Sequence, residues 1–126
     1  MTKLKLVVCG LFAVSLGAIV IYRTATVAGQ VGGSDLTAPT GLTATDSRYN
    51  NRVGLHWDAI RGATTYRIFR NTANDPGTAT DIGSTVQNIF FDTNIPAGQA
   101  TFYWVRAENA LTQSPMSASD QGTRAV

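Results

Sequence analysis

Residues 53–70 read VGLHWDAIRGATTYRIFR, and this stretch decides the fold class. Val53, Leu55 and Trp57 take every second position of its first part, and Tyr66 and Ile68 do so in its last part. Because successive side chains of a β-strand point to opposite faces, this period of two predicts two strands that each bury one face. No apolar stripe with the period of a helix interrupts them.

The same alternation recurs in short runs on both sides of this stretch, separated by turn residues. Residues 74–77, Asn-Asp-Pro-Gly, predict one such turn, because proline fixes φ and glycine tolerates positive φ. Further strands are expected over residues 41–45, 80–85, 88–92, 102–107 and 117–124. About seven short strands without helices predict an all-β antiparallel sandwich or barrel. The predicted core residues are Leu42, Val53, Leu55, Trp57, Tyr66, Ile68, Tyr103, Val105 and Ala107.

Residues 1–28 predict a targeting segment. Residues 6–22 carry no charge and lie between Lys3 and Lys5 on one side and Arg23 on the other. A basic start before an apolar run is typical of a signal peptide, here cleaved before Gly29, while an uncleaved apolar helix would anchor the chain in a membrane. The positive-inside rule exports the remaining residues in both cases, to the cell surface or beyond. Residues 29–38 predict a flexible linker, and residues 39–124 the folded domain.

The charge balance excludes a broad nucleic-acid-binding face. Residues 1–30 hold a net charge of +3 and residues 31–126 hold −1, so the net charge of +2 comes from the N-terminus. No extended cationic surface is then available to displace counterions from phosphates. The single cysteine, Cys9, lies in the apolar run, which excludes disulfides within the chain and cysteine-ligated zinc.

The domain resembles a fibronectin type III domain, an immunoglobulin-like sandwich of two sheets. The resemblance rests on the order and spacing of five motifs: Pro39-x-x-Leu42, Val53-x-Leu55-x-Trp57, Gly62-Ala63-x-x-Tyr66-x-Ile68, Phe91-Asp92-x-x-Ile95-x-x-Gly98 and Tyr103-x-Val105-x-Ala107. It implies that Trp57 is the central core aromatic, with Tyr66 beside it. Thr101 stands at the position of the family's corner tyrosine, and Ala97 at that of its proline. Asp92 is expected to cap the loop before Gly98.

The sequence argues against an enzyme, a metal site and a cofactor. The one histidine, His56, has Asp58 two residues along the same predicted strand, but no motif places a nucleophile nearby. The eight acids are spread singly. Asp75, Asp81 and Asp46 lie in turn regions without the regular ligand spacing of a calcium loop, so turn formation explains them better.

One face is a candidate binding surface. If Tyr66 and Ile68 point inward, their strand neighbours point outward, and the same holds opposite Tyr103 and Val105. The family places these two strands side by side, so one patch of rings and guanidinium groups is expected from Arg67, Phe69, Phe102, Trp104 and Arg106. Aromatic and arginine side chains are favoured at interfaces, and flat rings stack on sugars. The alternative is that the two arginines cover the two rings by cation–π contact.

The resemblance implies a non-catalytic extracellular module that binds or adheres to a protein or a polysaccharide. A second hypothesis is a structural subunit that associates with itself in a membrane-anchored surface assembly or filament. Residues 1–10 loosely resemble a prepilin leader ending at Gly10, and membrane contact is expected only through residues 6–22, if these are kept. A third hypothesis is a spacer within a larger secreted carbohydrate-active enzyme.

Overall fold

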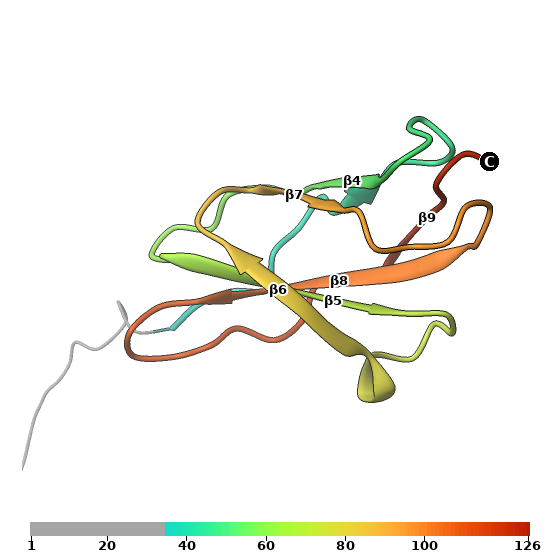
Figure 1. Cartoon of the computed structure of the whole chain (residues 1–126). Coiled ribbons are helices and arrows are strands. Elements are labelled where there is room, and N and C mark those ends of the chain that lie inside the picture. Colours follow the sequence, from blue (N-terminus) through green and yellow to red (C-terminus); the bar gives the residue numbers. More distant parts are fainter. Residues whose placement is uncertain (1–34) are drawn as a thin grey trace, which may run out of the picture. The chain divides into compact units, whose positions relative to one another are not determined.

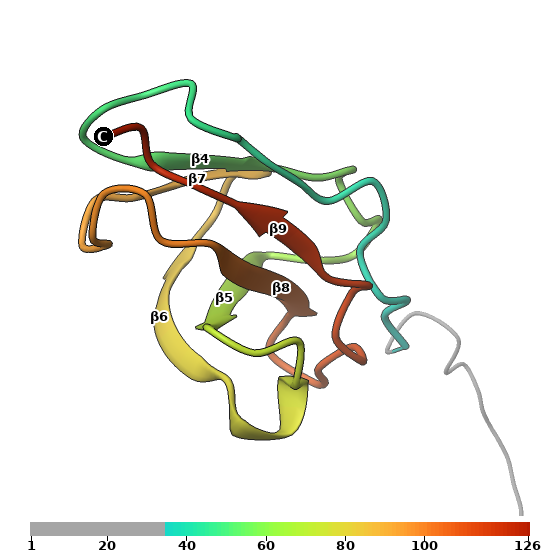
Figure 2. The same cartoon turned by 90° about the vertical axis from the view of Figure 1, so that its right-hand side faces the viewer.

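The computed structural model describes residues 35–126, which form two antiparallel β-sheets packed face to face (Figure 1). The three-stranded sheet has the order β3-β4-β7, with β3 at Thr43–Ala44, β4 at Val53–His56 and β7 at Ile89–Asp92. The four-stranded sheet has the order β6-β5-β8-β9, with β5 at Thr65–Asn71, β6 at Thr80–Thr85, β8 at Thr101–Glu108 and β9 at Asp120–Gly122. Figure 2 shows β4 and β7 on one side of the domain and β5 and β8 on the other. The predicted all-β sandwich is confirmed.

The predicted N-terminal features lie outside the described residues. These are the signal peptide or anchor over residues 1–28, its apolar helix, and all but the end of the linker over residues 29–38. Within residues 35–126, none of the helices is long and apolar enough to cross a bilayer.

The last strand is shorter than the prediction over residues 117–124, because serine side chains take over part of its hydrogen bonding. The backbone N–H groups of Val105 and Ala107 donate to the hydroxyls of Ser117 and Ser114, at 3.0 and 2.9 Å. Pro115 lies between the two serines and has no N–H to donate. The chain therefore follows β8 irregularly, and regular pairing begins only at Asp120.

Trp57 lies at the centre of the core, with Tyr66 beside it in an edge-to-face arrangement. Their ring centroids are 5.4 Å apart and their planes are inclined by 64°. Leu42 packs half-buried against this core, and all the other residues named above as core members are buried. Burial of this apolar surface between the sheets is the main stabilising contribution to the fold.

A polar network connects the two sheets at the start of the loop over residues 93–100. Asp92, at the end of β7, accepts hydrogen bonds from the Tyr103 hydroxyl at 3.0 Å and from the Arg70 guanidinium. Its other oxygen accepts the N–H of Asn94 at 3.0 Å, so Asp92 caps this loop. Burial and the Asp92 charge raise the pKa of Tyr103, so its hydroxyl stays protonated and can donate. These bonds hold the loop that a corner tyrosine would hold.

Candidate binding site

The structure brings the predicted binding residues together on neighbouring strands of the four-stranded sheet. Arg67 lies opposite Arg106 and Phe69 lies opposite Trp104 in the β5–β8 register. Phe102 lies near the start of β8, two residues before Trp104 and opposite Asn71. The alternation read from the sequence thus assembles the expected cluster across the two strands.

Two members of this cluster are much less accessible than expected. Phe69 and Trp104 are exposed by only 8% and 3%, so the prediction that both rings face solvent is wrong. The Arg106 guanidinium lies over the Phe69 ring, 5.1 Å from its centroid. Cation–π packing of this kind desolvates a ring that points away from the main core. Neither ring offers an open face for stacking.

The charges of this face neutralise one another. Arg67 donates from Nε to Glu108 at 3.0 Å and from Nη1 to Asp81 at 3.1 Å, and Arg106 donates from Nη2 to Glu108 at 2.9 Å. The hydrogen bond with Glu108 is the largest of the effects that raise the pKa of Arg67. Burial raises the pKa of Glu108, but the hydrogen bonds from Arg67 and Arg106 outweigh it and lower the pKa. Two guanidinium groups are thereby engaged within the protein.

A second cluster of rings and arginine lies on the outer face of the three-stranded sheet. The Arg52 guanidinium lies 4.6 Å from the ring centroids of both Tyr49 and Phe91. Gly54 makes room for the two rings, because a Cβ at this position would lie 3.3 Å from an atom of each. Gly54 pairs with Phe91 in the β4–β7 register, which fixes the ring above the glycine. We call Tyr49, Arg52 and Phe91 the outer-face cluster.

This outer-face cluster lies beside accessible apolar side chains. Phe91 is 44% exposed and Ile89, two residues before it on the same face of β7, is 39% exposed. His56 pairs with Ile89 and is exposed as well. Ile89 and Phe91 are neighbours on one strand face. Contiguous exposed apolar side chains indicate an interaction site, whereas scattered single ones are ordinary.

Sequence reasoning missed the outer-face cluster, although one signal was present. A glycine inside an otherwise apolar strand indicates close approach of another group, and Gly54 is such a residue. The partners that approach it lie in a different loop and a different strand, so their identity depends on strand register.

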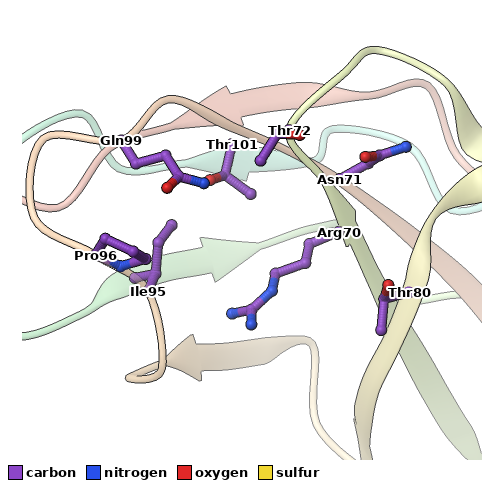
Figure 3. A pocket seen from close by; sticks show the side chains of 8 residues that line it. All are labelled: Arg70, Asn71, Thr72, Thr80, Ile95, Pro96, Gln99 and Thr101. Carbon is purple, nitrogen blue, oxygen red and sulfur yellow. The ribbon is translucent and has the colours of Figure 1, made fainter.

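A small hollow lies at the start of β8, beside the buried hydroxyl of Thr101 (Figure 3). It has a volume of about 230 Å³ and an apolar wall of Ile95 and Pro96. The charge of Arg70 is already paired with Asp92, and the Thr101 hydroxyl is closed off from solvent without a hydrogen-bond partner. The hollow therefore presents no free reactive group, and it lies where the family's corner tyrosine is replaced.

The histidine and aspartate considered for catalysis are not brought together by a hydrogen bond. Asp58 accepts a hydrogen bond from the Thr40 hydroxyl at 2.9 Å, and His56 lies 3.5 Å from the side-chain nitrogen of Asn88. Asp75 caps the short 3₁₀ helix η3 (Pro76–Thr78) by accepting the N–H of Gly77 at 2.9 Å. Among residues 35–126, no group of three or more acidic, histidine or cysteine side chains could hold a metal ion.

Solved structures with a similar fold place this domain in a known fold class. It is similar to an Fn3-like protein from Clostridium thermocellum, at 27% sequence identity and a TM-score of 0.63, over 73% of this chain and 94% of that one. The domain has the fibronectin type III fold. No family model matches the sequence, and no curated protein matches it.

Two further fibronectin type III matches are parts of longer chains. A β-1,2-glucanase from Parabacteroides distasonis is 26% identical, with a TM-score of 0.61, over 74% of this chain and 13% of that one. A pectate lyase from Erwinia chrysanthemi is 18% identical, with a TM-score of 0.57, over 68% of this chain and 27% of that one. The fibronectin type III fold does not determine function, so the function has to be inferred from the residues on the surface of the domain.

Proposed function

We propose that this chain is an exported, non-catalytic fibronectin type III module that binds a polysaccharide. The contact surface is the outer face of the three-stranded sheet. The observation that carries the proposal is the adjoining exposure of Ile89 and Phe91, beside the outer-face cluster. Exposed aromatic rings pack against the C–H faces of sugars, and Phe91 is 44% exposed although Arg52 lies over part of its ring. The match to the glucanase supports a polysaccharide over a protein as the partner.

The β5–β8 face that the sequence predicted as the binding surface is not the contact surface proposed here. Phe69 and Trp104 are buried, so only Arg67, Phe102 and Arg106 remain accessible there, each of them partly. Two of these three are arginines whose guanidinium groups already bind Glu108. A ligand that recruits either arginine would have to compete with these ion pairs.

Affinity electrophoresis of the full chain tests the proposed function. Native gels containing a neutral β-glucan, dextran or polygalacturonate are compared with a gel that contains no polysaccharide. We expect at least one polymer to retard the wild type. Phe91→Thr should reduce the apparent affinity by up to about tenfold, because an aromatic contact contributes about 0.5–1.5 kcal/mol, and threonine preserves strand propensity.

Leu111→Thr is the matched control, since it also removes an exposed apolar side chain but from the loop after β8. It should migrate like the wild type in every gel. If no polymer retards the wild type, or if Phe91→Thr is retarded as strongly as the wild type, the proposed function is rejected.

A spacer function within a larger secreted carbohydrate-active enzyme is the second candidate. It is favoured by the match to the glucanase, in which the similar segment makes up 13% of the chain. A reading frame that continues past Val126 into a catalytic domain would support it, and a spacer would show no retardation by any polymer.

A further inference from the structure

Arg52 is held in a fixed orientation but has no anionic partner. Its guanidinium lies between the Tyr49 and Phe91 rings, 4.6 Å from each centroid. It makes no hydrogen bond or ion pair within residues 35–126, and its Nε is buried without a partner. The Arg52 side chain is only partly buried, so part of its guanidinium group remains in contact with solvent. A guanidinium stacked between rings keeps its in-plane donors available for a carboxylate.

Arg48 adds a second cation near Tyr49, again without an ion pair among the described residues. It is exposed and lies 5.7 Å from the centroid of that ring. The four ion pairs within the described part of the chain involve only Arg67, Arg70 and Arg106. The arginines of the outer face are therefore distinct from the neutralised arginines of the β5–β8 face.

The acids nearest to the outer-face cluster in the sequence do not neutralise it. Asp46 lies two residues before Arg48, is exposed and makes no ion pair within residues 35–126. Asp92 follows Phe91 but points inward, to Arg70 and Tyr103. The outer face thus combines two arginines without an ion pair among the described residues and a partly exposed aromatic ring, although residues 31–126 as a whole hold a net charge of −1.

We infer that this face binds an acidic polysaccharide, with Arg52 holding a uronate carboxylate and Phe91 contacting the sugar ring. Arg48 is placed to meet a neighbouring carboxylate of the same polymer. A uronic acid residue carries a carboxylate for the guanidinium group and a C–H face for the Phe91 ring, whereas a run of acidic side chains such as poly-glutamate offers the carboxylates alone. The inference rests on the proposed function and specifies its ligand.

The test uses the full chain in gels containing polygalacturonate, methyl-esterified polygalacturonate, neutral β-glucan or poly-glutamate. Esterification removes the carboxylate charge but keeps the sugar backbone. We expect polygalacturonate alone to retard the wild type strongly, and the retardation to disappear at high salt, where exposed charges are screened. Arg52→Gln should weaken binding about tenfold or more, since charge-assisted hydrogen bonds are worth about 1.5–3 kcal/mol.

Arg61→Gln is the matched control because Arg61 is also exposed and makes no ion pair within residues 35–126, so the net charge changes equally. It should bind as the wild type does. Arg52→Lys should recover only part of the affinity, since an ammonium lacks the planar fork. Circular dichroism checks the fold of each variant, and Arg48→Gln, at an exposed position, replaces Arg52→Gln if the latter does not fold.

The outcomes separate this inference from the proposed function. Equal binding by Arg52→Gln and Arg61→Gln overturns the inference, as does equal retardation by poly-glutamate, which would indicate an acidic protein partner. Retardation by neutral β-glucan that depends on Phe91 but not on Arg52 overturns the inference and leaves the proposed function standing. The absence of retardation by every polysaccharide rejects both.

Discussion

Thr101 buries a hydroxyl group that makes no hydrogen bond within residues 35–126, which lowers the free energy of unfolding of the domain. Its side chain is 2% exposed and its hydroxyl has no hydrogen-bond partner. A buried hydroxyl that has lost its bond to water destabilises the folded state. The network of Arg70, Asp92 and Tyr103 supplies the loop contacts that a corner tyrosine would make, so the domain folds without that ring.

We therefore expect Thr101→Val to stabilise the domain. Valine has nearly the same shape and no hydroxyl, so the free energy of unfolding should rise by about 1 kcal/mol. Urea unfolding followed by Trp fluorescence measures the change. Thr65→Val, at a half-exposed position of β5, is the control and should change little; a loss of stability in Thr101→Val would show that the hydroxyl makes a useful bond.

At the scale of elements, the pairing of β5 with β8 supports two predictions, and the first concerns the rings. Because Trp104 is buried opposite Phe69, Trp104→Ala should lower the free energy of unfolding by about 3–5 kcal/mol. Substitution of an exposed binding residue by alanine would instead leave the free energy of unfolding almost unchanged. Phe102→Ala, at a half-exposed position of the same strand, should cost less, and similar losses in urea unfolding for both variants would contradict the burial.

The second element-scale prediction concerns Glu108, which joins Arg67 and Arg106 across the same strands. Its pKa is lower in the folded state than in the unfolded state, so it stabilises the fold above the unfolded-state pKa and loses this effect as the pH falls through the folded-state pKa. Glu108→Gln should cost about 1 kcal/mol at pH 7, and this cost should shrink below about pH 4. Urea unfolding at pH 7 and pH 3 measures it. A cost that is equal at both pH values would contradict the ion pairing.

The alternation of apolar residues was sufficient to predict the sheets and the Trp57 core, because burial of one strand face follows directly from a period of two. The same rule placed Phe69 and Trp104 on the strand face opposite Ile68 and Val105, but it did not predict that both rings are buried. For Phe69 this burial involves Arg106, whose guanidinium lies over the ring. The outer-face cluster could not be predicted either. It requires the register that sets Phe91 opposite Gly54, and that register comes from long-range pairing.

At the scale of the whole molecule, the proposed export depends on residues 1–28. A cleaved signal peptide predicts a native protein that begins at Gly29, whereas an anchor or filament subunit keeps the apolar residues 6–22. Intact mass spectrometry of the protein isolated from its native source distinguishes these alternatives. A mass that includes residues 1–28 would contradict cleavage and favour the membrane-anchored assembly.

The serine-assisted path of the chain beside β8 has a consequence for how copies of this domain meet one another. A long, regular outermost strand invites a neighbouring molecule to continue its hydrogen-bond ladder, which is how many β proteins begin to aggregate. Here Ser114, Pro115 and Ser117 interrupt that border, and only a short β9 remains regular. Copies of this module can therefore stand close together at high local concentration without joining along this border.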